Sequence, residues 1–256
     1  MLHHKDMKWR LRSGFAEECM KLCQKRKISP EQINQIFSSF ALKFMDDKVH
    51  GVRIAGAQLL AEIFSVYVEK EWSYMPEDGR DLIFEEDYSI LNSMPLTRTL
   101  LYNAHKAFYK NASWRRRQTW AIFLEFVTHT ITKQQFCYIF RKDIYAVAHD
   151  SCRNTRMKFC QILESLLEYK ENETPLYQLF PSTYSVVRKL LEKMAKFDSD
   201  FEIQTQAQII LGLLNPTTDC LDFKGFLEKR KVQVLCDQNK QERRITTIIF
   251  FIYIIC

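Results

Sequence analysis

The stretch NASWRRRQTWAIFLEFV, residues 111–127, is one of five copies of a pattern that recurs along the chain. The other copies, which align with it without a gap, are residues 6–22, 47–63, 150–166 and 198–214. Each unit begins with Asp or Asn at position 1, and four of the five carry Arg at position 7. Those arginines are Arg12, Arg53, Arg117 and Arg156, and the last unit has Gln204 instead. Self-similarity of this kind is typical of repeat proteins.

An apolar pattern follows the arginine in each unit. Position 11 is small in four units, and positions 14 and 17 are apolar in all five. Residues at this spacing share one face of a helix. The step from Arg12 to Arg53 is 41 residues and that from Arg117 to Arg156 is 39, a length that fits two helices per repeat.

The remaining boundaries follow from start and stop signals. Ser29 before Pro30, Thr132 and Ser151 are hydroxyl starts, and Pro216 stops the last run. We expect helices at about 5–26, 30–46, 49–71, 96–110, 113–130, 132–148, 151–170, 174–196 and 200–214. Short connections make consecutive helices antiparallel neighbours. The acid-rich stretch 72–95 interrupts the rhythm and is expected to be an inserted loop.

Composition agrees with a helical protein. The chain has 256 residues, of which 46% are hydrophobic, and only 6 Gly and 6 Pro to make turns. A net charge of +6 is too mild to indicate nucleic-acid binding by itself. Eight cysteines are scattered without CxxC spacing, and the start MLHHKDMKWR has no apolar signal-peptide core. We therefore expect reduced thiols and a cytoplasmic location.

The Asp and Arg positions predict a ladder between repeats. A carboxylate is favoured at the N-terminal end of a helix, whereas an Arg one turn further in is mildly disfavoured there and needs an acid. We expect the acid to come from a neighbouring repeat, with the ladder made of Asp6, Arg12, Arg53, Arg117, Arg156 and Asp198.

The fold class expected is all-α. Residues 1–216 should form an α-solenoid of antiparallel helix pairs of the HEAT/armadillo type, with about four repeats. Residues 217–256 should form a non-repeat C-terminal segment with a short apolar tail. That tail, residues 245–256, would span about 18 Å as a helix against a hydrocarbon core of about 30 Å, so we expect no transmembrane anchor.

Two units open with a Trp-Arg pattern, MKWRLRSGF from Met7 and ASWRRRQTW from Ala112, and a third reads HDSCRNTRMKFC at 149–160. These motifs resemble the HEAT-repeat regulatory subunits of serine/threonine protein phosphatases. The Trp-Arg openings are similar to the scaffold (A) subunits of protein phosphatase 2A, and the NTRMKFC segment is similar to regulatory subunits of protein phosphatase 4. The resemblance covers roughly residues 7–214.

This resemblance implies a non-catalytic scaffold that binds a phosphatase catalytic subunit, or another protein, along the turns between paired helices. The family binds partners just before and within the Trp-Arg opening. The matching positions are Trp9, Asp47, Asn111, Trp114, Arg115, His149 and Asp150. An adaptor of another HEAT class, binding tubulin or serving nuclear transport, is the alternative.

Other functions find less support in the residues. Arg115, Arg116 and Arg117 spread over about 200 degrees of a helix, so they cannot form one nucleic-acid-binding face. Cys19 and Cys23 lie beside packing positions and are expected to be core rather than metal ligands. Motifs for phosphate loops, nucleophile elbows or metalloproteases are missing from the sequence. We expect no catalytic residues, no metal and no cofactor.

Overall fold

The computed structural model describes residues 8–72, 89–167 and 181–214, and all its regular elements in these ranges are α-helices. The chain divides into two units, Met1–Ile210 and Leu211–Cys256, and of the second only the last four residues of α12 are described. The expected division at 216 and the apolar tail therefore lie outside the described residues. The helices are α1 (Trp9–Gln24), α2 (Pro30–Ile36), α3 (Ser38–Met45), α4 (His50–Glu71), α5 (Ser89–Asn92), α6 (Pro95–Phe108), α7 (Trp114–Val127), α8 (Lys133–Ala148), α9 (Arg153–Leu167), α11 (Pro181–Phe197) and α12 (Phe201–Leu214).

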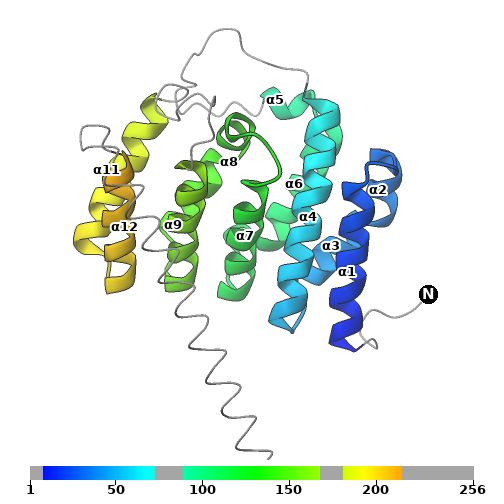
Figure 1. The fold of residues 1–256 in the computed structure, drawn as a ribbon, viewed down its shortest axis with the longest axis horizontal. Helices are drawn as coiled ribbons and strands as arrows, with labels where there is room; N and C mark the ends of the chain where they lie inside the picture. Colours follow the sequence, from blue (N-terminus) through cyan, green and yellow to red (C-terminus); the bar gives the residue numbers. More distant parts are fainter. Residues whose placement is uncertain (1–7, 73–88, 168–180, 215–256) are drawn as a thin grey trace, which may run out of the picture. The chain divides into compact units, whose positions relative to one another are not determined.

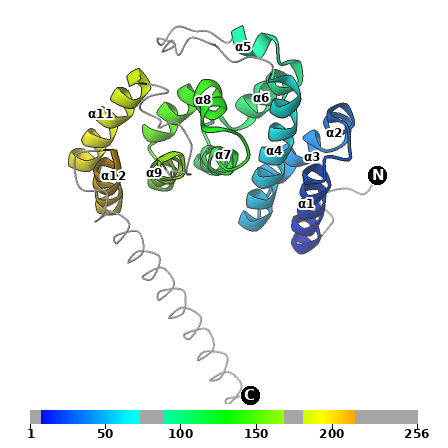
Figure 2. The same cartoon turned by 45° about the horizontal axis from the view of Figure 1, so that its top comes forward.

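The helices of the first unit form two layers (Figures 1 and 2). In one layer α1 contacts α4, α4 contacts α7, and α7 contacts α9. Each of these helices begins with one of the repeat units, and α12 carries the fifth. In the other layer α3 packs on α4, α6 on α7, and α8 on α9. The expectation of an all-α solenoid of antiparallel helix pairs is confirmed.

Two of the three hydroxyl residues expected to start helices are N-caps in the structure. Ser29 and Thr132 each form a capping box, with Gln32 and Gln135 as the reciprocal partners. Ser151 is not a cap, however, because α9 begins two residues later at Arg153. Its hydroxyl instead lies 3.2 Å from Arg117 Nη2. The backbone turn before α9 is held by Asp150, the acid of the repeat.

The segment expected as one helix at 30–46 is two helices, α2 and α3, with a break at Phe37. Phe37 is both the C-cap of α2 and the N-cap of α3: its N–H donates to Ile33 O, and its carbonyl accepts from the Ala41 N–H. Both helices contact α4.

The insertion at 72–95 is closed at its base by one carboxylate. Glu71, the last residue of α4, accepts hydrogen bonds from the backbone N–H groups of Leu96 and Thr97 and from the Thr97 hydroxyl, at 2.8 to 2.9 Å. An acid at a helix N-terminus satisfies orphan donors and favours the dipole. The start of α6 is therefore fixed to the end of α4. Within the insertion, Ser89–Asn92 form the one-turn helix α5, and residues 73–88 lie outside the described part.

The core centres on α4, which is buried almost all round because α1, α3, α6 and α7 surround it. By length and composition α4 could cross a membrane, but 72% of its most apolar window is buried in the protein, as in a core helix. Gly56 permits the closest crossing, since a Cβ there would lie 2.6 Å from the Met45 backbone nitrogen. Trp120 is 1% exposed and donates from Nε1 to Asp143 at 3.0 Å, which ties α7 to α8.

Candidate functional site

The turns that precede the second helix of each pair are built around the residue at position 1. Its side-chain oxygen accepts the backbone N–H two residues later, at 2.7 to 2.9 Å. This local bond stabilises a turn in which Asp and Asn serve equally well. The four described pairs are Asp47 with Val49, Asn111 with Ser113, Asp150 with Cys152, and Asp198 with Asp200.

The arginine at position 7 connects this turn to the next one. Arg117 donates from Nη1 to the carbonyls of Asn111 and Ala112, in its own turn. Its Nε and Nη2 donate to both carboxylate oxygens of Asp150 in the next turn, at 2.7 and 3.1 Å. Arg156 does the same with its own turn and Asp198. Each arginine therefore fixes the spacing between two successive helix pairs.

Three ion pairs of this kind, which we call rungs, are present among the described residues: Arg12–Asp47, Arg117–Asp150 and Arg156–Asp198. Each aspartate side chain is 4 to 6% exposed and each arginine side chain 12 to 19% exposed. Bidentate pairs with this shielding are stronger than surface ion pairs. The hydrogen bond to its carboxylate raises the pKa of each of the three arginines. Asp6, expected in the ladder, lies outside the described residues.

Arg53 differs from the other arginines at position 7. It donates from Nη1 to the carbonyls of Asp47 and Lys48, as its counterparts do in their own turns. However, among the described residues it forms no ion pair, because position 1 of the next unit is Asn111 and not an acid. The Asn111 side chain donates instead to Ala107 O. The expected Arg53 rung is therefore missing between α4 and α7.

This junction carries a different ion pair. Arg116, at the start of α7, donates to both carboxylate oxygens of Asp46 at 2.7 and 2.6 Å. The acid comes from the earlier turn and the arginine from the later helix, which reverses the polarity of the rungs. Both side chains are more than two-fifths exposed, so we expect this bridge to be weaker than a rung.

Position 4 of each unit is the first residue of α1, α4, α7, α9 or α12, and this residue is exposed in all five units. The residues are Trp9, His50, Trp114, Arg153 and Phe201, which we call the exposed column. Trp9 is 45% exposed, Trp114 47% and Phe201 79%. The Arg10 Cζ lies 4.8 Å from the centroid of the Trp9 ring, and the Arg115 Cζ lies 5.5 Å from the centroid of the Trp114 ring. Each column residue directly follows the turn that precedes its helix.

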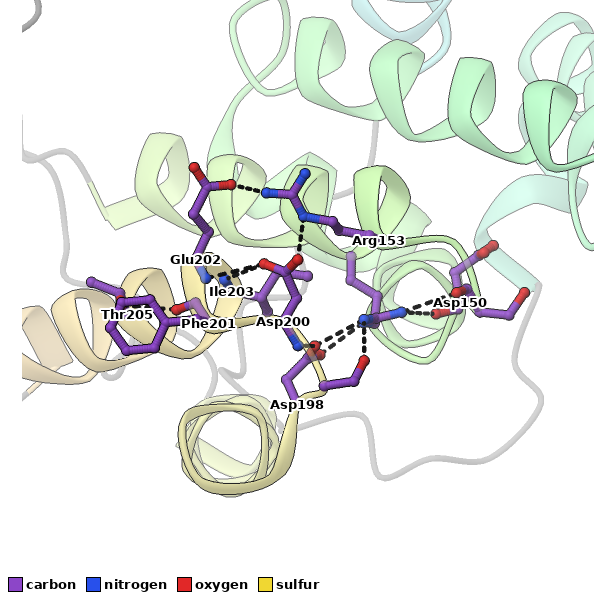
Figure 3. A network of polar contacts seen from close by, with 11 residues as sticks. Asp150, Arg153, Asp198, Asp200, Phe201, Glu202, Ile203 and Thr205 are labelled. Carbon is purple, nitrogen blue, oxygen red and sulfur yellow. Dashed lines mark hydrogen bonds and ion pairs between the residues drawn. The ribbon is translucent and has the colours of Figure 1, made fainter.

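Polar contacts surround the column where α9 meets the turn before α12 (Figure 3). Arg153 lies between Asp200 and Glu202 and forms ion pairs with both. Asp200 also accepts the backbone N–H groups of Glu202 and Ile203, which caps α12. The exposed Phe201 therefore begins α12 next to a turn that these hydrogen bonds hold in place.

The residues expected to bind a partner separate into two groups. Asp47, Asp150 and Asn111 are engaged inside the protein, where they hold turns and rungs. Trp9, Trp114, Arg115 and His149 are exposed. His149 directly follows α8 as its C-cap, and its Nδ1 lies 2.9 Å from Tyr145 O. The residues expected to bind a partner did not include His50, Arg153 or Phe201, although these align with the two tryptophans in the repeat.

A groove of about 1070 Å³ adjoins two of these turns. It lies between the α6–α7 turn, the C-terminal half of α8, and Val186 of α11. Its wall includes the bases Lys110, Arg117, Arg141, Lys142 and His149 and the acid Asp150. The groove therefore brings Asn111, His149 and Asp150 of the expected partner site together, whereas Trp9, Asp47 and Trp114 lie outside its lining.

The buried thiols are consistent with a packing role. Cys19 and Cys23 are 2% and 0% exposed, and burial raises their pKa values to about 11 and about 12. Such thiols are poor nucleophiles and poor metal ligands because the thiolate is the reactive form. In the described part of the chain, no group of three His, Cys, Asp or Glu residues is placed to hold a metal.

No family model matches the chain. No curated protein matches its sequence. Among solved structures, the archaeal HEAT-like repeats protein from Thermococcus onnurineus NA1 is similar over 80% of each chain, with 8% sequence identity and a TM-score of 0.35. A likeness at this level says nothing about partner or activity.

Proposed function

We propose that this chain is a non-catalytic regulatory or scaffold subunit that binds a catalytic subunit of a serine/threonine protein phosphatase of the 2A/4 type. The observation that carries the proposal is the exposed column. Its two tryptophans stand at equivalent first positions of α1 and α7, each 45 to 47% exposed and each covered by the following arginine. Exposed Trp and Arg are the residues most enriched in the energetic centres of protein interfaces.

The rungs support a scaffolding mechanism. They fix the turns by shielded ion pairs and backbone contacts, so a partner that binds the column does not have to order it first. Less ordering on binding means that more of the contact energy appears as affinity. The Trp-Arg openings and the NTRMKFC segment support a phosphatase as the partner, through their resemblance to phosphatase regulatory subunits. A cytoplasmic location belongs to the same proposal and fits the free thiols of Cys19, Cys23, Cys137, Cys152 and Cys160.

A capture experiment separates this proposal from the alternative adaptor class. The full chain is immobilised and incubated separately with purified 2A-type and 4-type catalytic subunits, with tubulin, and with a duplex nucleic acid. We expect capture of a catalytic subunit and of neither other probe. Capture of tubulin with no catalytic subunit would make the phosphatase assignment wrong.

A further inference from the structure

The junction between α4 and α7 contains an arginine, Arg53, whose equivalents each bind a carboxylate but which forms no ion pair with any residue that the structure describes. Three equivalent arginines each donate to both oxygens of an acid in the next turn. Arg53 has the same position, the same helix start and the same contacts to its own turn. At this junction, however, position 1 of the next unit is Asn111, whose amide donates to Ala107 O. Arg116 and Asp46 form an ion pair at the same junction, but position 1 offers Arg53 no acid.

Electrostatics distinguish Arg53 in the same way. Ion pairing raises the pKa of Arg12, Arg117 and Arg156. Burial lowers the pKa of Arg53, and the charge of Arg115 lowers it further against the weaker effects of Asp47 and Asp46. A half-buried cation beside a second cation is stabilised by any anion that reaches it.

The surroundings of Arg53 are open to a partner. The distance between His50 Nδ1 and Arg53 Nη2 is 3.2 Å, and His50 is a member of the exposed column. Arg115 is exposed and lies over Trp114, the next member. The two acids nearest in sequence are already paired, Asp47 with Arg12 and Asp46 with Arg116. A carboxylate arriving at this part of the column would meet Arg53 and Arg115 together.

We propose that Arg53 is a binding site for an aspartate or glutamate side chain of the protein partner, which completes the ladder between α4 and α7. The inference rests on the proposed function only for the identity of that partner. It specifies an acidic segment that places one carboxylate at Arg53 and a neighbouring side chain against Trp114. A phosphatase or any other partner without such a segment would bind elsewhere on the chain.

Asn111→Asp gives the sharpest test because it supplies the missing acid within the chain. The variant should raise Tm by forming the fourth rung, and it should block the site. Arg53→Gln removes the cation but keeps a donor for the turn, as Gln204 does by donating to Asp198 O. Asn103→Asp, on the exposed surface of α6, makes the same charge change away from the junction and is the matched control.

The probe is a fluorescein-labelled hexaglutamate peptide, titrated at low ionic strength against the full chain. We expect binding to weaken about tenfold or more in Asn111→Asp and in Arg53→Gln, as for the loss of a charge-assisted hydrogen bond. Asn103→Asp should bind as the unmodified chain does. Equal binding by all four proteins, or an Asn111→Asp variant without a higher Tm, would overturn the inference.

The same variants separate this inference from the proposed function. If the chain captures a catalytic subunit and Asn111→Asp captures it equally well, the carboxylate site is wrong and the phosphatase role stands. If hexaglutamate binding depends on Arg53 but no catalytic subunit is captured, the acid site stands and its partner is a different protein.

Discussion

Arg117 and Asp150 form a bidentate ion pair across 33 residues of sequence, and the same arginine holds the carbonyls of Asn111 and Ala112. One side chain therefore joins two successive turns. The pair is mostly shielded from water, at 19% and 6% side-chain exposure, so we expect it to contribute more than a surface pair.

A double-mutant cycle measures that contribution. Arg117→Gln keeps a donor for its own turn, and Asp150→Asn keeps the acceptor for the Cys152 N–H, so each change removes mainly the ion pair. We expect a coupling free energy of about 1 to 2 kcal/mol from urea unfolding. A coupling free energy near zero would show that the rung does not stabilise the stack.

The Arg156–Asp198 rung predicts a pH dependence. Burial raises the pKa of Asp198, but hydrogen bonds from Arg156 and from the Asp200 N–H together lower it below its ordinary value of 3.8. Because the folded pKa is below the unfolded one, the stabilisation is present above pH 3.8 and is lost as the pH falls through the folded pKa. The difference in unfolding free energy between the unmodified chain and Arg156→Gln should therefore shrink as pH falls from about 6 to about 3. If the difference in unfolding free energy stays constant over this pH range, the predicted pH dependence is wrong.

Removing the Thr155 hydroxyl should not destabilise the fold. Its hydroxyl is buried and has no hydrogen-bond partner among the described residues, at a position where other units have Val52 and Ile203. Thr155→Val should leave stability unchanged or raise it by up to about 1 kcal/mol, because a buried hydroxyl without a partner costs free energy. Thr119 is equally buried, but its hydroxyl donates to Arg115 O at 2.8 Å, so Thr119→Val should destabilise the fold by about 1 kcal/mol. Thermal unfolding of the two variants checks this difference. Equal changes in Tm for Thr155→Val and Thr119→Val would contradict the prediction.

Gly56 should be intolerant of a side chain. A methyl group there would lie 2.6 to 2.7 Å from backbone atoms of Phe44 and Met45, which cannot move without shifting α3. We expect Gly56→Ala to cost about 1 to 3 kcal/mol in chemical denaturation. Gly14 is also inside a helix but has nothing within 4 Å, so Gly14→Ala should instead gain about 0.5 to 1 kcal/mol. Equal effects in the two variants would show that the α3–α4 crossing is not tight.

The repeat pattern predicts much of this structure because its signals are periodic. Ala57, Ala121 and Cys160 at position 11 are 0% exposed, which follows from small side chains on a shared helix face. The last unit departs from it, since Gln208 is exposed and Ala207 is buried instead. The break at Phe37 has no counterpart in local sequence signals, and both α2 and α3 contact α4.

The candidate site was less predictable, for chemical reasons. Asn111 and Asp150 are equivalent as acceptors in a turn, so the alignment groups them together. Only an acid can form the rung, however, and this difference separates Arg53 from Arg117. The exposed column mixes aromatic, histidine and arginine side chains at one position, so composition does not reveal it. Its members share their place at the start of a helix and their exposure, which the structure supplies.

We propose that the exposed column binds the phosphatase catalytic subunit. The Kd of the purified catalytic subunit is therefore measured for the full chain and for the double variant Trp9→Ala/Trp114→Ala. Tyr102→Ala is the control, because Tyr102 is 66% exposed on α6 and is not in the column. We expect the double variant to bind about tenfold more weakly or worse, with an unchanged helical circular dichroism spectrum, and the control to bind normally. A double variant that binds as tightly as the unmodified chain would contradict the account.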